Sequence, residues 1–184
     1  MRELTVDMFV SLDGFAAGSD GSQGVILGPG GPELGGYIQG VLDEPQVMLL
    51  GRLTYEILSG FWPSSTEPPA ARMNSLPKVV FSNTLDEPLE WNASLVKGDL
   101  AEEILALKRE TGDPLRSIGS LTLVRGLIRL GLVDRLRLVV FPVVLGTAGS
   151  QPMFEGYDVT RLELVDTSVL DANTVVLEYR LVGS

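Results

Sequence analysis

The sequence contains no cysteine and no histidine. The chain can therefore form no disulfide, has no thiolate or imidazole for catalysis, and lacks the usual ligands of zinc and copper. Carboxylates could still bind Mg²⁺ or Ca²⁺, but the sequence has no Asp-rich loop of that kind. It therefore indicates no metal site.

Positive charge is scarce as well, since 14 Lys and Arg face 24 Asp and Glu and leave a formal net charge of −10. Nucleic acids and anionic membranes attract clustered positive charge, so we expect neither as a partner. No apolar run is long enough to cross a membrane, and the N-terminus does not resemble a signal peptide. We expect a cytoplasmic protein.

The hydrophobic patterns predict a single α/β domain over residues 1–184. From residue 46 onward, strands alternate with helices, which is typical of a central, mostly parallel sheet flanked by helices. Two alternating segments near the C-terminus predict an antiparallel hairpin. Strands are expected at 3–12, 46–50, 78–82, 94–97, 116–118, 136–144, 161–170 and 174–182, and helices at 33–44, 54–61, from Asp99 to Gly112, and at 121–130.

Two segments carry no clear helix or strand pattern. Glycine occurs eight times between residues 18 and 36. Such a long, permissive loop is either a binding lid or a surface excursion, and composition favours neither. A second, Pro/Ser-rich loop is expected after Trp62-Pro63.

The ends of the predicted strands carry residues that suit a phosphate-containing ligand. In parallel sheets, ligands bind beyond the carboxyl ends of the strands, near the unpaired N–H groups of helix N-termini. At the first such junction, Gly51 allows close approach, Arg52 can pair with a phosphate and Thr54 can donate its hydroxyl. The alternative is that Arg52 is a surface residue or an ion-pair partner of Glu56.

Two further junctions have the same character. Ser82-Asn83-Thr84 presents neutral donors where an NAD site would want an acid, which favours the 2′-phosphate of NADP, although a polar turn is the alternative. Ile118-Gly119-Ser120 could lay backbone N–H groups against a pyrophosphate, without the G-x-G-x-x-G fingerprint. Asp13 ends the first strand, where it could face a substrate or form an ordinary Asp-Gly turn.

Together these segments resemble the dihydrofolate-reductase-like family, in the branch related to the C-terminal reductase domain of the bacterial riboflavin-biosynthesis deaminase/reductase. The matching segments run in order along almost the whole chain. They are S-L-D-G-F at 11–15, L-L-G-R-L-T-Y-E at 49–56, F-W-P at 61–63, P-K-V-V-F-S-N-T-L at 77–85, G-S-L-T-L-V-R-G-L at 119–127, G-L-V-D-R-L-R-L at 131–138, P-V-V-L-G at 142–146 and Q-P-M-F at 151–154.

The resemblance implies NADPH as the cofactor, bound along the edge that these junctions form. Asp13 would face the substrate. The cofactor would be held by Gly51, Arg52 and Thr54 at its phosphates, Ser82 and Asn83 at the adenosine 2′-phosphate, Lys97 beside the adenine, and Gly119, Ser120 and Leu121 on the pyrophosphate and nicotinamide side.

The implied activity is hydride transfer to a small heterocyclic, carbonyl or imine substrate that resembles a pterin or a pyrimidine. The substrate stays open, because Ile118-Gly119-Ser120 replaces the Glu-Gly-Gly of the riboflavin-pathway reductase. The alternatives are a non-catalytic nucleotide- or small-molecule-binding protein on the same fold, and an enzyme that prefers NAD. Relatives often form homodimers, so we expect a homodimer, in which a strand surface such as Leu136–Val144 could supply the contact; the same composition also fits a monomer.

Overall fold

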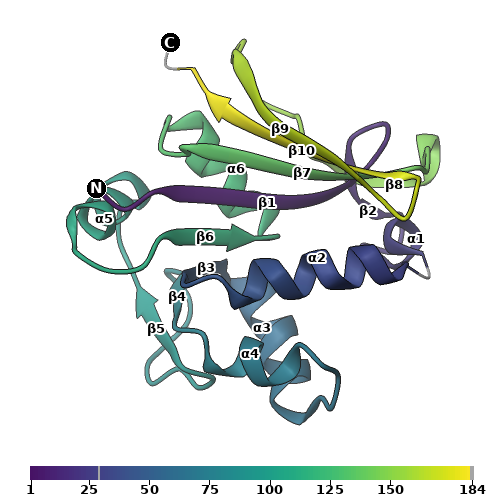
Figure 1. Ribbon diagram of the computed structural model, residues 1–184. Coiled ribbons are helices and arrows are strands. Elements are labelled where there is room, and N and C mark those ends of the chain that lie inside the picture. The colour runs from purple at the N-terminus through teal and green to yellow at the C-terminus, as the bar shows by residue number, and fades with distance from the viewer. Residues whose placement is uncertain (29, 183–184) are drawn as a thin grey trace.

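The computed structural model describes residues 1–28 and 30–182, and its centre is an eight-stranded sheet with helices on both faces (Figure 1). The strand order is β5-β4-β3-β6-β1-β7-β10-β9. The strands are β1 Leu4–Ser11, β3 Val47–Gly51, β4 Lys78–Phe81, β5 Ala93–Val96, β6 Leu115–Ile118, β7 Arg135–Phe141, β9 Leu162–Leu170 and β10 Thr174–Leu181, and a separate two-stranded sheet joins β2 Phe15–Gly18 to β8 Gly149–Pro152.

Within the described residues, six helices connect these strands. They are α1 Gly24–Leu27, α2 Pro32–Asp43, α3 Arg52–Phe61, α4 Ala70–Ser75, α5 Leu100–Arg109 and α6 Leu121–Arg129, with single 3₁₀ turns η1 Trp62–Ser64 and η2 Gly146–Ala148. Strands β5, β4, β3, β6, β1 and β7 run parallel, whereas β10 is antiparallel to both β7 and β9. The predicted fold class is therefore confirmed, including the C-terminal hairpin.

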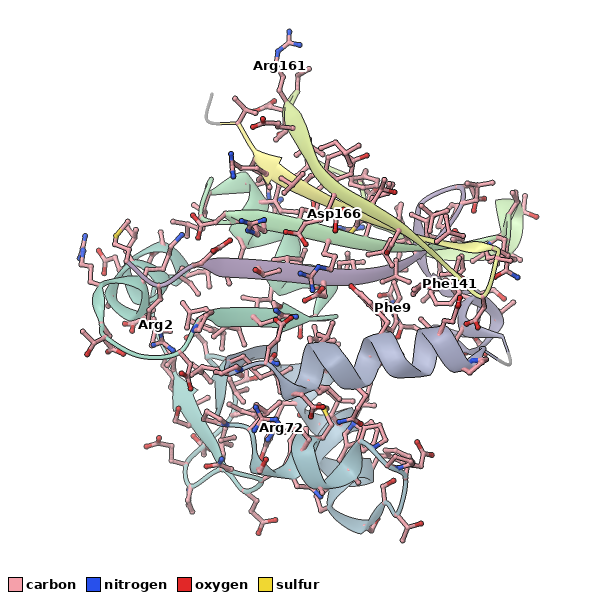
Figure 2. The ribbon with its side chains drawn as sticks, in the orientation of Figure 1. Arg2, Phe9, Arg72, Phe141, Arg161 and Asp166 are labelled. Atoms are coloured by element: carbon pink, nitrogen blue, oxygen red, sulfur yellow. The ribbon has the colours of Figure 1, made fainter. Side chains whose placement is uncertain are left out.

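The central strand β1 is buried on both faces, as expected for a parallel sheet covered by helices. Leu4, Val6, Met8 and Val10 belong to the core beneath α5 and α6. The alternate residues face α2, where the rings of Phe9 and Phe141 meet edge to face with centroids 5.8 Å apart (Figure 2).

In three places the structure differs from the predicted pattern of elements. Helix α3 begins at Arg52 rather than Thr54. The Pro/Ser-rich loop contains η1 and α4, because Met73 and Leu76 pack into a core that Leu42 shares with residues of β3 and β4. The glycine-rich segment is not one continuous loop, since it forms the last residue of β2, then α1 and the start of α2.

The strand surface suggested for a dimer contact lies inside the sheet. Strand β7 is flanked by β1 and β10, and Leu136, Leu138 and Val139 are buried. The exposed edge is instead β9, which pairs only with β10. None of the described helices is both long and apolar enough to cross a membrane.

Candidate functional site

The predicted site residues follow the carboxyl ends of five neighbouring parallel strands. In sheet order these are Lys97 after β5, Ser82 after β4, Gly51 at the end of β3, Gly119 after β6 and Asp13 after β1. Four strand intervals of about 4.8 Å each separate the first from the last, a span of roughly 19 Å. The residues therefore line one elongated edge, which we call the carboxyl rim.

The beginnings of α3 and α6 meet at the centre of this rim. The Gly51 amide donates to Ser120 Oγ over 2.9 Å, and a side chain at Gly51 would contact Ser120 and Leu123. Gly119 and Ser120 both adopt positive φ, at +69° and +59°. That conformation is costly for serine, so the backbone is held in an unusual turn directly before α6.

Neither helix neutralises its own N-terminus. The residues before α3 and α6 make no side-chain cap, and neither helix has an acidic residue in its first turn. The first amides of a helix lack intrahelical partners and carry a partial positive charge. An anion at this junction would therefore meet unpaired N–H groups from two helices.

Arg52 is the first residue of α3, where a cation is unfavourable beside the positive end of the helix. Its guanidinium Nη1 lies 3.1 Å from both carboxylate oxygens of Glu56, and both side chains are more than 40% exposed. The alternative of a Glu56 partner thus exists in the structure. Because an exposed ion pair contributes little, about 0.3–0.5 kcal/mol, it leaves Arg52 free to exchange partners.

The residues at the β4 and β5 end are tied to each other by turn contacts. Ser82 Oγ accepts from the Thr84 and Leu85 amides, and Asn83 Oδ1 accepts from the Gly98 amide over 3.1 Å. Lys97 pairs with Asp86 at 3.3 Å on the surface. These bonds fix the loops and leave the Asn83 amide group and the Lys97 charge at the rim.

Asp13 joins the end of β1 to the loop after β7. Its carboxylate accepts from Ser11 Oγ and from the Leu145 and Gly146 amides. These bonds lower the pKa of Asp13 to about 2. The carboxylate is therefore ionised at neutral pH and has no proton to give. That Asp13 faces a substrate stays a prediction.

Sequence reasoning missed the acid that caps α2. The Glu33 and Leu34 amides donate to the carboxylate of Asp171, in the turn between β9 and β10, and Glu33 in return accepts from the Asp171 amide. Gly31, the residue before α2, has no side chain that could cap the helix, and Asp171 supplies the cap from a segment distant in sequence. No local signal could reveal this cap, because its two parts lie more than 130 residues apart in sequence.

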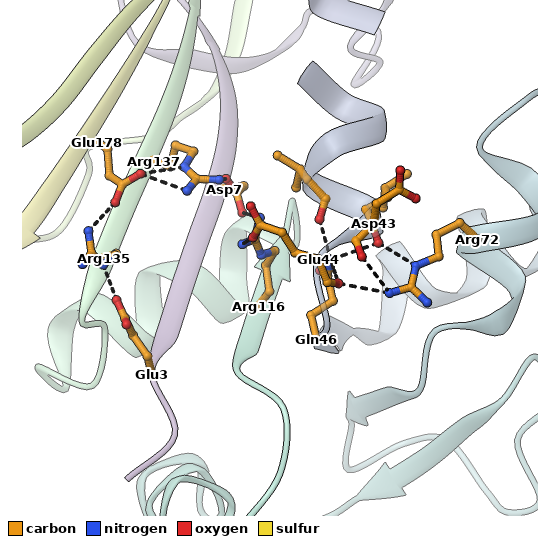
Figure 3. Close-up of polar contacts among 12 residues, drawn as sticks. Glu3, Asp7, Asp43, Glu44, Gln46, Arg72, Arg116, Arg135, Arg137 and Glu178 are labelled. Atoms are coloured by element: carbon orange, nitrogen blue, oxygen red, sulfur yellow. Dashed lines mark hydrogen bonds and ion pairs between the residues drawn. The ribbon is translucent and has the colours of Figure 1, made fainter. Parts of the chain in front are cut away.

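A buried ionic cluster beneath α2 was also missed (Figure 3). Asp7 on β1 lies 3.4 Å from Arg116 on β6 and 3.6 Å from Arg137 on β7. Its two carboxylate oxygens have no hydrogen-bond partner among the described residues, and burial raises the pKa of Asp7 to about 6. The sequence signal for this cluster was a charged residue within each of three strands, at positions that alternate with buried apolar residues in β1 and β7. These residues are Asp7, Arg116 and Arg137.

The outer members of the cluster connect Asp7 to the surface. Arg116 also pairs with Glu44, directly after α2, and Arg137 pairs with Glu178 on β10 at 2.9 Å. Arg135 joins Glu178 to Glu3. The cluster therefore links the end of α2 to four strands.

Comparison with known proteins places this architecture in a family. A family model described as the RibD C-terminal domain matches residues 2–176. The chain belongs to this family. The predicted resemblance to the C-terminal domain of the riboflavin-biosynthesis enzyme is thereby confirmed.

Individual relatives of this RibD C-terminal domain protein are similar in sequence or in fold. The uncharacterised protein YyaP of Bacillus subtilis is 29% identical over 190 residues, which cover 99% of this chain and 96% of YyaP. A protein from Shewanella sp. PV-4 that is named for riboflavin biosynthesis is 22% identical to this chain. Its crystal structure matches with a TM-score of 0.80, and the match covers 100% of both chains.

Dihydrofolate reductase from Enterococcus faecalis, complexed with NADP(H), is also similar. It is 17% identical with a TM-score of 0.68, over 97% of this chain and 96% of that chain. At such low identity the likeness establishes the fold, and the dihydrofolate-reductase-like architecture is confirmed.

Proposed function

We propose that this protein is an NADPH-dependent reductase that transfers hydride to a small heterocyclic, carbonyl or imine substrate resembling a pyrimidine or a pterin. The observation that carries the proposal is the junction of α3 and α6, where two uncapped helix N-termini meet on the carboxyl rim. Membership of the RibD C-terminal domain family and the fold shared with an NADP(H)-bound reductase support it.

The rim residues fit a dinucleotide in three respects. Gly51 and Gly119 keep side chains away from the two helix beginnings, so phosphate oxygens can approach the amides. Arg52 supplies a mobile positive charge beside them. Ser82, Asn83 and Lys97 offer neutral and cationic donors, which suit a 2′-phosphate better than a free ribose hydroxyl.

When bound, NADPH supplies the hydride, and the protein contributes orientation and the exclusion of water. The Ser120–Gly51 bond would hold the two helix beginnings at a fixed spacing for the phosphates. Asp13 would keep the loop after β7 in place beside the end of β1. Because Asp13 stays ionised, the proton for the reduced product must come from water or from another acid.

A binding titration tests the cofactor assignment. We expect NADPH to bind more tightly than NADH, and Arg52→Ala to weaken NADPH binding by about tenfold or more, since a charge-assisted contact contributes roughly 1.5–3 kcal/mol. Arg109→Ala, at the exposed end of α5, is the matched control and should leave the affinity unchanged. Equal affinity of the Arg52 variant and the wild type in calorimetry would remove Arg52 from the site.

The second candidate function is a non-catalytic nucleotide-binding protein on the same fold. The bonding of Asp13 favours it, because the one acid proposed at the substrate is engaged by three donors. This function predicts normal NADPH binding but no loss of NADPH fluorescence with any pterin, pyrimidine or imine substrate. Oxidation of NADPH with any member of such a panel would decide for the reductase.

We also propose that the protein is a homodimer and that the contact is made by β9. Every residue from Leu162 to Val169 is exposed, including Leu164 at 52% and Val169 at 60%. Edge strands of this length are normally protected from pairing with other chains. Light scattering during gel filtration should give twice the mass of the 19.8 kDa chain, and a mass of one chain would refute the dimer.

A further inference from the structure

The hairpin of β9 and β10, at the outer edge of the sheet in Figure 1, has two faces of opposite character. Strand pairing shows which side chains share a face, because residues opposite each other in neighbouring strands point to the same side. Leu138 of β7 belongs to the core beneath α6, and Leu177 of β10 and Thr167 of β9 follow it in the same row.

The side of the hairpin that faces the α5 and α6 layer is apolar. Seven of its eight residues are apolar, whereas only two of the eight residues on the α2 side are. We call the apolar side the hairpin face, and it consists of Leu162, Leu164, Thr167, Val169, Val175, Leu177, Tyr179 and Leu181.

The outer half of the hairpin face has no covering layer. On β10, Leu177 and Tyr179 are half-buried and pack against the core beneath α6. Farther out, on β9, Leu164 is 52% exposed and Val169 is 60% exposed. Because the apolar face of a sheet is normally packed against another layer of protein, the hairpin face lacks the layer that its residues call for.

The exposed area of the whole chain agrees with a missing layer. The chain of 19.8 kDa exposes 9640 Å², whereas folded monomers of this mass expose roughly 8600 Å². The excess of about 1000 Å² is close to the roughly 800 Å² that one partner buries in an interface of standard size. The chain thus has enough surplus surface for one stable contact.

Charge favours a second copy of the chain as the covering layer. No residue of the hairpin face is charged, although the chain has a formal net charge of −10. Two such faces can therefore meet without bringing like charges together. The opposite side of the hairpin carries Glu163, Asp166 and Glu178, which would repel the same residues of another copy. A two-fold contact joins the same patch on both subunits, and an uncharged apolar patch is complementary to itself.

The free edge of β9 is less suited to this contact than its face. The register between β9 and β10 shifts between Glu178 and Tyr179, which makes Val165 a bulge in β9. Bulges and charged residues are the means by which edge strands avoid pairing with another chain. Strand β9 has both, since Glu163 and Asp166 lie on either side of the bulge.

We infer that two copies of the chain associate by packing their hairpin faces against each other, as the two sheets of a β-sandwich do, about 10 Å apart. This inference rests on the proposed homodimer and names the surface that forms it. The second copy supplies the layer missing over β9, so that Leu164 and Val169 of both chains leave water.

Charged substitutions on the hairpin face test this contact by light scattering over a dilution series. The dissociation constant of the dimer should rise at least about tenfold in Leu164→Lys/Val169→Lys, because charges would enter an apolar interface. Leu164→Thr/Val169→Thr, which keeps a β-branched residue at both positions, should weaken the dimer by a smaller factor. Ser168→Lys is the matched control, because it adds the same charge to the opposite side of the same strand. It should leave the dissociation constant unchanged, and circular dichroism should show all variants folded.

The absence of cysteine from the chain permits a second measurement. Single variants Leu164→Cys, Val169→Cys and Ser168→Cys each carry one thiol, which a short bismaleimide can link between subunits. Packing of the hairpin faces should give linked dimers from Leu164→Cys or Val169→Cys and none from Ser168→Cys. Pairing of the β9 edges would instead bring positions on both sides to within about 5 Å of their counterparts.

The outcomes separate this inference from the proposals on which it rests. A dimeric wild type whose dissociation constant is unchanged in both double variants, or that links equally well through Ser168→Cys, would overturn the hairpin-face contact and leave the homodimer standing. A wild type that is monomeric at every concentration would overturn both. Neither result depends on NADPH, so the reductase proposal is decided by its own titration.

Discussion

Helix α5 and the pair α3 and α6 begin on the same edge of the same sheet, yet they treat their N-termini in opposite ways. Asp99 caps α5 by accepting from the Ala101 and Glu102 amides, two glutamates occupy the first turn, and two cations occupy the last turn. The dipole of α5 is thus compensated within the helix. In α3 and α6 no side chain caps the start and no acid follows it. The chain therefore builds a self-compensated helix start at α5 and leaves the starts of α3 and α6 uncompensated.

Two aspartates, one within β1 and one just after it, also differ in how the protein compensates their charge. Asp13 is exposed but accepts three hydrogen bonds, so its pKa is lowered to about 2. Asp7 is buried between two arginines without a hydrogen bond, so its pKa is raised to about 6. Ion pairing alone does not offset the burial of a carboxylate when its oxygens lack hydrogen-bond donors.

The largest expected effect concerns Asp7 and stability. A carboxyl group with a folded pKa of about 6 and an ordinary value of 3.8 destabilises the ionised folded protein. Stability should therefore rise as the pH falls from about 6 to about 4, by up to about 3 kcal/mol from this group. Urea unfolding of Asp7→Asn should lack this rise relative to the wild type. Asp113→Asn, at an exposed position, should keep it, and an identical pH profile for all three proteins would refute the assignment.

The second prediction makes α3 more like α5. Leu53, 62% exposed in the first turn of α3, can be changed to glutamate without disturbing the core. Leu53→Glu should stabilise the free protein by about 0.5 kcal/mol through the helix dipole. The same charge should repel the cofactor phosphates and weaken NADPH binding by about tenfold.

Leu53→Gln provides the neutral control for that experiment. It should change neither the stability nor the NADPH affinity appreciably, because it adds no charge. If Leu53→Glu leaves NADPH affinity unchanged in calorimetry, the start of α3 does not contact the cofactor, and the contrast with α5 has no functional meaning.

Local signals predicted those parts of the fold that depend on neighbouring residues. The cap at Asp99 and the hairpin turn at Asp171 were both recognisable, because the residues and the backbone they shape lie within a few positions. Helix α4 was not, because its buried Met73 gains stability from packing against residues distant in sequence, such as Leu42 and Met48. Propensity alone does not describe such a helix.

Long-range order explains the remaining errors. The β composition of residues 136–144 identified a strand correctly but could not show that β1 and β10 flank it. Likewise, Asp7, Arg116 and Arg137 become neighbours only once the strand order is known. The rim residues could be predicted, because carboxyl ends of parallel strands share one edge whatever their order.

The smallest expected effect tests the other half of the comparison. If the Asp99 cap serves only to stabilise the N-terminus of α5, then Asp99→Ala should lower the free energy of unfolding by about 1 kcal/mol, because two amides lose their acceptor. Asp99→Asn, which keeps an oxygen acceptor, should recover most of that loss. Neither variant should alter NADPH affinity, measured by the same titration as for Leu53→Glu. A clear loss of affinity without a loss of stability would place the start of α5 among the ligand-binding elements, and the difference between the two kinds of helix start would then need another cause.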